Sequence, residues 1–386
     1  MPHVKGHVSV DVMEDGRIVD HAEHDNYVSP FVYGALRKYV NAHFMMLHDE
    51  TYLYRNSFGY PQYALNSAFI LTDYAGPVNT RERVIHGTPL SYGYHQYVSN
   101  NANECSFNKD ESYRKANSLR FVFDFSTSQG NGTFQSIYSG PSVDNPRYKA
   151  GYQLLTDSNV RWRVTYCDGK IYTPDTDWIV AFTVDDWITR LNGDTWNRQA
   201  IQVSGAGLND MTSLTAYNHS IYWVNGQSIC SAPVTDLTDV TTHNIGDYCR
   251  AISYSAIRDS FFIIISNNEV REYSTSFELK KTFTGDYDYN ISAMPEENSV
   301  LIGNRVYDID DNANALKPCA RWEASPFQCM TFIGEFALAY ENVYTGLYLG
   351  TQYFSRARLD KPVTKNSRQT MKITYDFNMP PIDWEH

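Results

Sequence analysis

Aromatic side chains are the residues of this sequence whose type and spacing best fit recognition chemistry. Sugars present apolar faces that stack on aromatic rings, and tyrosine adds a polar tip to its apolar area. The chain contains 30 Tyr, 19 Phe and 7 Trp. An abundance of tyrosine is equally typical of ordinary all-β proteins. The aromatic residues considered as sugar-stacking platforms are Trp178, Trp187, Trp196, Tyr217 and Trp223.

These aromatic residues differ in the regularity of the sequence around them. Trp223 alternates with Ile221, which is typical of a buried strand, so we expect it in the core. Trp187 and Trp196 lie in a loop-rich stretch, and loops on a rigid scaffold are where binding residues collect. The alternative is that these rings only pack the fold. The predicted ligand-binding residues are Trp187, Trp196, Trp178 and Tyr217.

Carboxylates offer a second chemistry, the hydrolysis of glycans, which requires two carboxylic groups flanking the sugar. Aspartate is also a common turn residue, and the chain has 44 Asp and Glu, so turn chemistry is the favoured explanation. Residues 189–196 (TRLNGDTW) half resemble the sialidase Asp-box, but Leu191 replaces its aspartate. No HExxH, GxSxG, GxGxxG or P-loop pattern is present, and we expect no enzyme. The carboxylates near predicted strand junctions are Asp185, Asp186, Asp247, Asp286 and Asp288.

Cysteine and histidine do not form a metal-binding pattern. The six cysteines are scattered without CxxC spacing, so we predict buried free thiols instead of disulfides or metal ligands. His21 and His24 are close together, but a turn or an exposed strand explains them. A zinc site would need clustered Cys and His at ligand spacing. We therefore predict neither a metal nor a cofactor.

The charge balance and hydropathy exclude other classes of partner. The formal net charge is −12, whereas sequence-independent nucleic-acid binding requires a basic surface. No apolar run is long enough to cross a bilayer, so we expect no membrane insertion. The apolar residues of the N-terminus alternate instead of forming a continuous run, so we expect no signal peptide and folding in a cytoplasm.

A repeat indicates the scaffold that positions these side chains. Residues 212–226, 251–268, 291–304 and 329–340 each read as an apolar strand, a polar turn and a second apolar strand, at an interval of about forty residues. A hairpin repeated at this interval is typical of a β-propeller, in which four-stranded blades lean on one another. We predict about four to five blades over residues 156–344, with 164–172 as the first hairpin.

The flanking sequence predicts a second, discontinuous β domain. Residues 8–20 alternate as a hairpin around Glu14-Asp15-Gly16. Ser29-Pro30 predicts the start of one N-terminal helix, whose apolar residues continue to Leu47 at helical spacing. Residues 119–125 and 371–377 alternate strongly, and the terminal strand needs a sheet to join.

We therefore predict a mainly all-β chain in which the propeller is inserted into a β-sandwich-like attachment domain. The attachment domain comprises 1–155 and is completed by the C-terminal strands of 345–386. Chain ends that meet in one domain are common where another domain is inserted. Residues 141–157 are expected to form the crossing into the propeller.

Three segments resemble structural proteins of tailed-phage virions. Residues 8–36 read VSVDVMEDGRIVDHAEHDNYVSPFVYGAL, a hairpin followed by a helix. Residues 120–137 read RFVFDFSTSQGNGTFQSI, similar to an F-x-F-x-T-x-x-x-NGT-x-x-S-I/V stretch of tail-tip and tail-fibre proteins. Residues 359–377 read LDKPVTKNSRQTMKITYDF, which resembles the P-V-x-K-x-x-x-x-T-M-K-V-T-Y ending of such proteins. In those proteins the N- and C-terminal matches belong to one module.

The resemblance implies a bacteriophage virion structural protein of the tail tip, tail fibre or another surface appendage. Its expected work is assembly and host attachment, with receptor binding to a host-surface glycan as an added role. The expected partners are other virion proteins within a symmetric homo-oligomer, and the expected location is the virion after synthesis in the bacterial host cytoplasm. Two alternatives remain open: a cell-envelope glycan hydrolase (a depolymerase), and a head fibre or capsid decoration protein without a receptor role.

Overall fold

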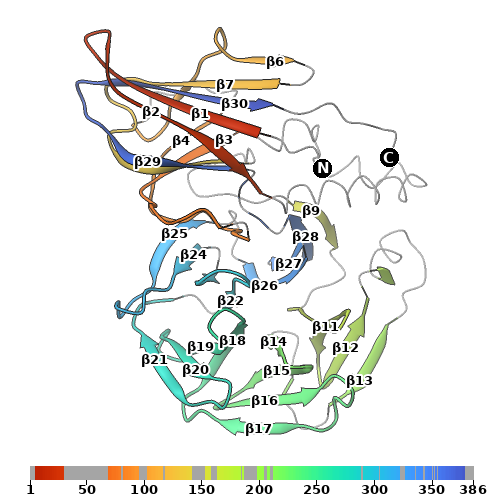
Figure 1. Cartoon of the computed structure of the whole chain (residues 1–386). Helices are drawn as coiled ribbons and strands as arrows, with labels where there is room; N and C mark the ends of the chain where they lie inside the picture. Colours follow the sequence, from red (N-terminus) through yellow and green to blue (C-terminus); the bar gives the residue numbers. More distant parts are fainter. Residues whose placement is uncertain are drawn as a thin grey trace. The chain divides into compact units, whose positions relative to one another are not determined.

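The structure is a computed structural model, and the chain forms two compact units, each built mainly of β-strands (Figure 1). The described residues of the sheet unit lie within 1–33, 56–151 and 351–386, and those of the propeller unit lie within 152–350. No helix of the described part is long and apolar enough to cross a membrane. The residues described are 5–29, 68–79, 81–94, 102–115, 118–140, 153–157, 163–183, 185–186, 198–203, 207–208, 212–287, 290–303, 305–321, 327–334, 336–341, 344–349, 351, 353 and 355–378.

One ten-stranded sheet organises the sheet unit, in the order β4-β3-β8-β29-β2-β1-β30-β7-β5, with β6 paired to β7. The strand β30 lies between β1 and β7, antiparallel to both. The pairing predicted for the C-terminal strand with the N-terminal sheet is therefore confirmed. The strands are β1 (Lys5–Glu14), β2 (Arg17–Val28), β3 (Ala68–Thr72), β4 (Pro89–Tyr94), β5 (Ser106–Phe107), β6 (Tyr113–Lys115), β7 (Ser118–Phe125), β8 (Gly132–Gly140), β29 (Ser355–Lys365) and β30 (Thr370–Asn378).

The hairpin of β1 and β2 follows from its turn residues. Asp15 and Gly16 both have positive φ, at 50° and 75°, and a two-residue turn of this kind matches the twist of the strands that it joins. Aspartate and glycine are the residues that accept this conformation most readily. The alternating valines Val8, Val10 and Val12 are at most 1% exposed, so this face of β1 forms part of the core.

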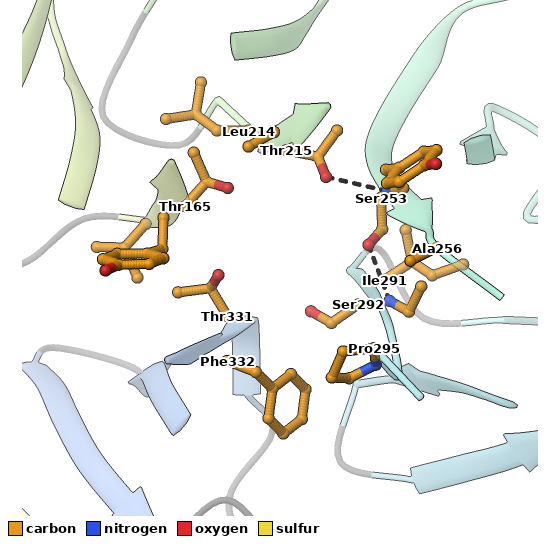
Figure 2. Close-up of a pocket in the computed structure, with 15 residues that line it drawn as sticks. Thr165, Leu214, Thr215, Ser253, Ala256, Ile291, Ser292, Pro295, Thr331 and Phe332 are labelled. Carbon is orange, nitrogen blue, oxygen red and sulfur yellow. Dashed lines mark hydrogen bonds between the residues drawn. The ribbon is translucent and has the colours of Figure 1, made fainter. Parts of the chain in front are cut away.

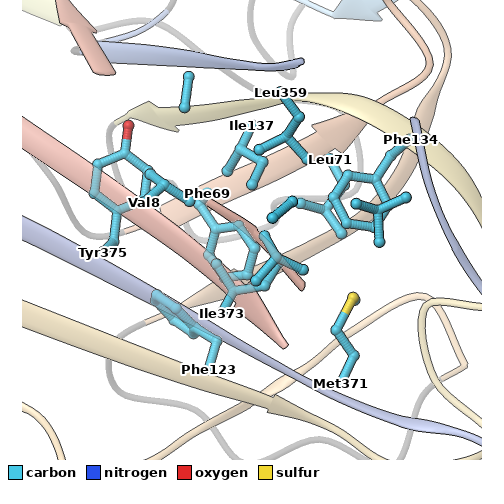
Figure 3. Close-up of a cluster of buried hydrophobic side chains, with 14 of the residues drawn as sticks. Val8, Phe69, Leu71, Phe123, Phe134, Ile137, Leu359, Met371, Ile373 and Tyr375 are labelled. Carbon is cyan, nitrogen blue, oxygen red and sulfur yellow. The ribbon is translucent and has the colours of Figure 1, made fainter. Parts of the chain in front are cut away.

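Among the described residues, strands from both ends of the sheet contribute side chains to one apolar cluster, which makes the unit sandwich-like (Figure 3). The rings of Phe69 on β3 and Phe123 on β7 lie 4.1 Å apart. The ends are joined by the backbone: the amide of Cys105 donates to the carbonyl of Tyr92 at 3.1 Å. A Cβ on Gly93 would lie 2.0 Å from the sulfur of Cys105, so this closure requires glycine.

The second and third phage-like segments meet in space. The strand β30 pairs with β7, and β29 pairs with β8. The ammonium of Lys365 donates to Asn131 Oδ1 at 2.8 Å, although Lys365 is only 1% exposed. The hydroxyls of Thr133 and Thr364 are 2.8 Å apart. Residues of the NGT motif thus contact residues of the P-V-x-K motif.

Burial of Lys365 gives the sheet unit a pH-dependent stability. Burial lowers the pKa of this ammonium from about 10.5 to about 8. Between these values the unfolded chain binds more protons than the folded chain, so the free energy of unfolding rises with pH across this window. From pH 8 to 10, the wild type should gain on the order of 2 kcal/mol of unfolding free energy relative to Lys365→Met. Urea titrations at the two pH values would measure this gain. The exposed Lys361→Met is the control and should show no such trend; a flat difference for both would contradict the prediction.

A buried ion pair fastens the segment between β3 and β4 to the sheet. Arg356 on β29 is fully buried, and its Nη1 lies 2.9 Å from Oε1 of Glu82, which is 2% exposed. The guanidinium also donates to the carbonyls of Gly76, at 2.7 Å, and Pro77, at 3.2 Å. Tyr353 donates to the other Glu82 oxygen at 3.1 Å. A buried charge with this many partners fixes the path of the segment.

Replacing Arg356 should therefore destabilise the sheet unit strongly. Arg356→Met leaves the Glu82 carboxylate buried without its cation, and we expect a loss of about 3–5 kcal/mol in urea unfolding. Arg120 pairs with Asp376 at 2.7 Å, but its side chain is 39% exposed. Arg120→Met should cost no more than about 1 kcal/mol. Equal losses for the two variants would show that Arg356 is not the stronger anchor.

The described residues of the propeller unit form five four-stranded antiparallel sheets, which are its blades. The first strands of the blades contact one another in a closed ring, from β10 through β14, β18, β22 and β26 back to β10. The predicted β-propeller is thus present. The strands of the first four blades are β10 (Thr165–Cys167), β11 (Lys170–Asp175), β12 (Trp178–Phe182) and β13 (Gln199–Gln202); β14 (Leu214–Tyr217), β15 (Ser220–Asn225), β16 (Ser228–Pro233) and β17 (Thr241–Asn244); β18 (Cys249–Ser255), β19 (Ser260–Ile265), β20 (Val270–Ser274) and β21 (Leu279–Phe283); and β22 (Ile291–Ala293), β23 (Ser299–Ile302), β24 (Arg305–Asp308) and β25 (Lys317–Arg321).

The fifth blade is built from both ends of the propeller sequence. It contains β26 (Phe327–Ile333), β27 (Phe336–Glu341), β28 (Tyr344–Leu349) and, from the opposite end, β9 (Gln153–Asp157). The expectation that 141–157 is only a crossing is wrong for β9. The assignment of all residues from 345 onward to the attachment domain is wrong for β28. Pairing of β9 with β28 closes the ring through backbone hydrogen bonds, which explains why the propeller extends past both predicted boundaries.

Of two further predicted elements, a turn lies among the described residues and a helix lies almost entirely outside them. The turn predicted at Asp168-Gly169 joins β10 to β11, and both residues have positive φ. The helix predicted from Ser29-Pro30 to Leu47 lies outside the described residues, apart from Ser29.

Candidate ligand site on the propeller axis

The first strands of all five blades line one cavity of about 170 Å³ at the centre of the propeller unit (Figure 2). Each of these strands supplies a small hydroxyl side chain at the same place in its repeat. The five hydroxyl residues are Thr165, Thr215, Ser253, Ser292 and Thr331.

Two of these hydroxyls bridge consecutive blades. Thr215 Oγ1 accepts a hydrogen bond from the amide of Tyr254 at 3.0 Å, and Ser253 Oγ accepts one from the amide of Ala293 at 2.8 Å (Figure 2). The acceptor is on the first strand of one blade, and the donor is on the first strand of the next. These bonds satisfy buried amides near the axis, where the inner strands have no further strand to pair with.

Two other hydroxyls have no such partner. Thr165 on β10 and Thr331 on β26 line the cavity where the first and fifth blades meet. Among the described residues, neither side-chain hydroxyl has a hydrogen-bond partner. Thr165 is only 4% exposed, and Figure 2 shows both hydroxyls directed toward the cavity. Because these two hydroxyls face the cavity and are not paired within the described protein, this side of the cavity suits a polar ligand or water.

The residues that follow the hydroxyls make the cavity walls uneven. Tyr166, Tyr254 and Phe332 place aromatic rings on three of the first strands, whereas Ala216 and Ala293 place methyl groups on the other two. No charged side chain is among the described residues that line the cavity. The site therefore combines hydroxyl groups with aromatic surface and carries no formal charge.

The aromatic residues predicted as ligand platforms lie elsewhere or outside the described residues. Trp187 and Trp196 are not among the residues described. Trp178 begins β12 and is 38% exposed. The ring of Tyr217 packs 4.4 Å from that of Tyr254, so it supports a ring of the cavity wall. Trp223 is fully buried, as its alternation predicts.

Three of the aspartates considered as candidate catalytic carboxylates accept hydrogen bonds from neighbouring side chains. Asp186 accepts from the Thr183 hydroxyl at 2.7 Å, Asp247 from Arg271 at 2.7 Å, and Asp286 from Asn268 at 2.7 Å. Asp288 is not described, and no carboxylate is among the described cavity residues. The sequence analysis did not predict the axial cavity, although the sequence contains a signal for it. Every repeat unit has a Ser or Thr at the same position of its first strand.

The cysteines and the candidate histidines also have structural surroundings. The prediction of buried free thiols is confirmed for the five cysteines that the structure describes fully, Cys105, Cys167, Cys230, Cys249 and Cys319. Burial raises the pKa of Cys167 to about 11 and that of Cys249 to about 12, which keeps both as thiols at neutral pH. His21 lies on the exposed face of β2, where a hydrogen bond with Asp11 at 2.7 Å raises its pKa.

Comparisons with known proteins identify no family for this chain. No protein-family model matches the chain, and no curated protein matches it. Among solved structures, the chain is similar to a WD40 β-propeller domain of Doa1, with 11% identity over 68% of this chain and 82% of that one and a TM-score of 0.33. It is also similar to the Pan2 WD40 domain of Neurospora crassa, with 8% identity over 65% and 88% of the two chains and a TM-score of 0.31. Glutaminyl cyclase of Myxococcus xanthus matches with 7% identity over 55% and 99% and a TM-score of 0.37. At these TM-scores none of the matches carries an argument about fold or function.

The two kinds of axial hydroxyl should respond oppositely to substitution. Ser253→Ala leaves the buried amide of Ala293 without its acceptor, and we expect a loss of about 1–3 kcal/mol in the unfolding free energy of the propeller. Thr165→Val keeps the shape but removes a hydroxyl without a partner, so its stability should stay within about 0.5 kcal/mol of wild type or rise. Urea titrations would compare them. A larger loss for Thr165→Val than for Ser253→Ala would contradict the assignment.

Proposed function

We propose that this chain is a structural protein of a tailed-phage virion, in which the sheet unit attaches the chain to the particle and the propeller unit presents a recognition site. One observation carries the proposal. The three segments that resemble phage tail proteins supply β1–β2, β7–β8 and β29–β30, which are neighbours in one sheet. Their motif residues contact each other directly, as Lys365 does with Asn131. The resemblance therefore concerns a single packed module, as expected for an attachment domain.

The order of the units along the chain supports display of the propeller. The propeller sequence lies between β8 and β29, so the strands on both of its sides belong to the sheet unit. A virion protein needs one part bound to the particle and another available to the host surface. Repetition around a symmetric appendage multiplies weak contacts into avidity, so we propose a symmetric homo-oligomer bound to other virion proteins.

The chemistry of the axial cavity supports recognition more than catalysis. Its hydroxyls and aromatic rings suit a neutral polar ligand, such as part of a host-surface glycan. Hydrolysis would require two carboxylic groups flanking the bound sugar, and the described lining supplies none. We propose a non-enzymatic protein that is made in the bacterial cytoplasm and incorporated into the virion.

Analysis of purified particles tests the proposal. Virions made by the phage genome that encodes this chain should contain the protein at a fixed copy number, measured by quantitative mass spectrometry after gradient purification. A non-structural protein encoded by the same genome is the control and should be depleted. Absence of the chain from purified particles would refute the virion assignment. Its presence on capsids but not on tails would support a head-decoration protein instead.

A further inference from the structure

We propose that the axial cavity of the propeller binds one uncharged terminal sugar unit, on the side where the first and fifth blades meet. This inference rests on the proposed role of the propeller in glycan recognition. It assigns the ligand to the axis instead of to the tryptophans of the loop-rich stretch.

Thr165 and Thr331 form the polar side of the proposed site. Their strands, β10 and β26, are neighbours in the ring of first strands, and both hydroxyls face the cavity (Figure 2). Neither side chain has a hydrogen-bond partner among the described residues, and Thr165 is 4% exposed. A threonine hydroxyl both donates and accepts. A sugar hydroxyl does the same, so two adjacent sugar hydroxyls can satisfy both threonines.

Aromatic side chains beside these threonines form the apolar side of the proposed site. Tyr166 and Phe332 immediately follow the two threonines in the sequence, and both line the same cavity. Aromatic faces bind the C–H faces of sugars through apolar area and ring polarisation. The other three blades provide no second pair of this kind, because Thr215 and Ser253 already accept amide hydrogen bonds and Ala216 and Ala293 carry no ring.

Charge and size restrict the ligand class. No charged side chain is among the described lining residues, and the chain has a net charge of −12. An acidic sugar or a phosphate would therefore lack a cation to pair with. The volume of about 170 Å³ accommodates on the order of ten water-sized positions. This is comparable to the non-hydrogen atoms of a single hexose, so a chain end fits better than an internal stretch of a glycan.

Saturation-transfer NMR with the full chain tests this assignment. The probes are glucose, galactose, N-acetylglucosamine and rhamnose, with N-acetylneuraminic acid as the charged comparison. At least one neutral sugar should show transfer, and the acidic sugar should show none. The double variant Thr165→Val/Thr331→Val keeps the cavity shape and should lower the affinity for the sugar by about tenfold or more. Ala216→Leu, which narrows the cavity from β14, the strand next to β10, should abolish binding. Urea unfolding confirms that each variant is folded.

Two control variants separate the outcomes. Tyr248→Ala removes an aromatic ring that is 56% exposed and does not line the cavity, and it should bind like wild type. Trp187→Ala/Trp196→Ala tests the loop-rich stretch. If the tryptophan variant loses binding while the threonine variant retains it, the axial assignment is overturned but glycan recognition stands. If no neutral sugar binds wild type, the cavity holds water only and the inference fails, whereas the virion assignment is decided separately by particle composition.

Discussion

The pairing of β9 with β28 is the constraint on which the propeller unit depends. A ring of blades that ended at its last strand would hold its first and fifth blades together by side-chain packing alone. The β9 strand instead joins the fifth blade through backbone hydrogen bonds, although it precedes the first blade in the sequence. This closure holds β10 beside β26, and so brings Thr165 and Thr331 to the same side of the axis. The candidate site is therefore a consequence of ring closure.

The sheet unit uses the same device of strands that are distant in the sequence. The strands β29 and β30 follow the propeller in the chain but pair with β2, β8, β1 and β7, which precede it. The Arg356–Glu82 pair then fixes the segment between β3 and β4 against the same sheet. Both units depend on non-local contacts, which form slowly because loop closure must precede their stabilisation. Once formed, they leave the propeller sequence as an insertion between β8 and β29, two paired strands of the sheet.

Local signals predicted much of this architecture. Alternation was sufficient for β1, β7 and β30, and the Asp-Gly pairs at 15–16 and 168–169 were sufficient for two hairpin turns. The repeat interval predicted the propeller. The role of β9 could not be predicted, because a five-residue strand resembles a linker until its distant partner is known. The Arg356–Glu82 pair has no local pattern either. The axial site was not predicted because it takes one small hydroxyl side chain from each blade, and a single Ser or Thr attracts less notice in a sequence than a single Trp. Alignment of the repeat units by their first strands would have shown the recurring Ser or Thr.

We propose that the sheet unit binds the particle while the propeller presents its axial cavity to the host. A cryo-EM map of the intact virion at side-chain resolution tests it most directly. We expect β1, β7 and β30 to belong to the part of the chain that contacts neighbouring virion proteins, and the cavity lined by Thr165 and Thr331 to open to solvent. A map in which the propeller is packed against the particle with its cavity covered, while the sheet unit projects freely, would contradict it.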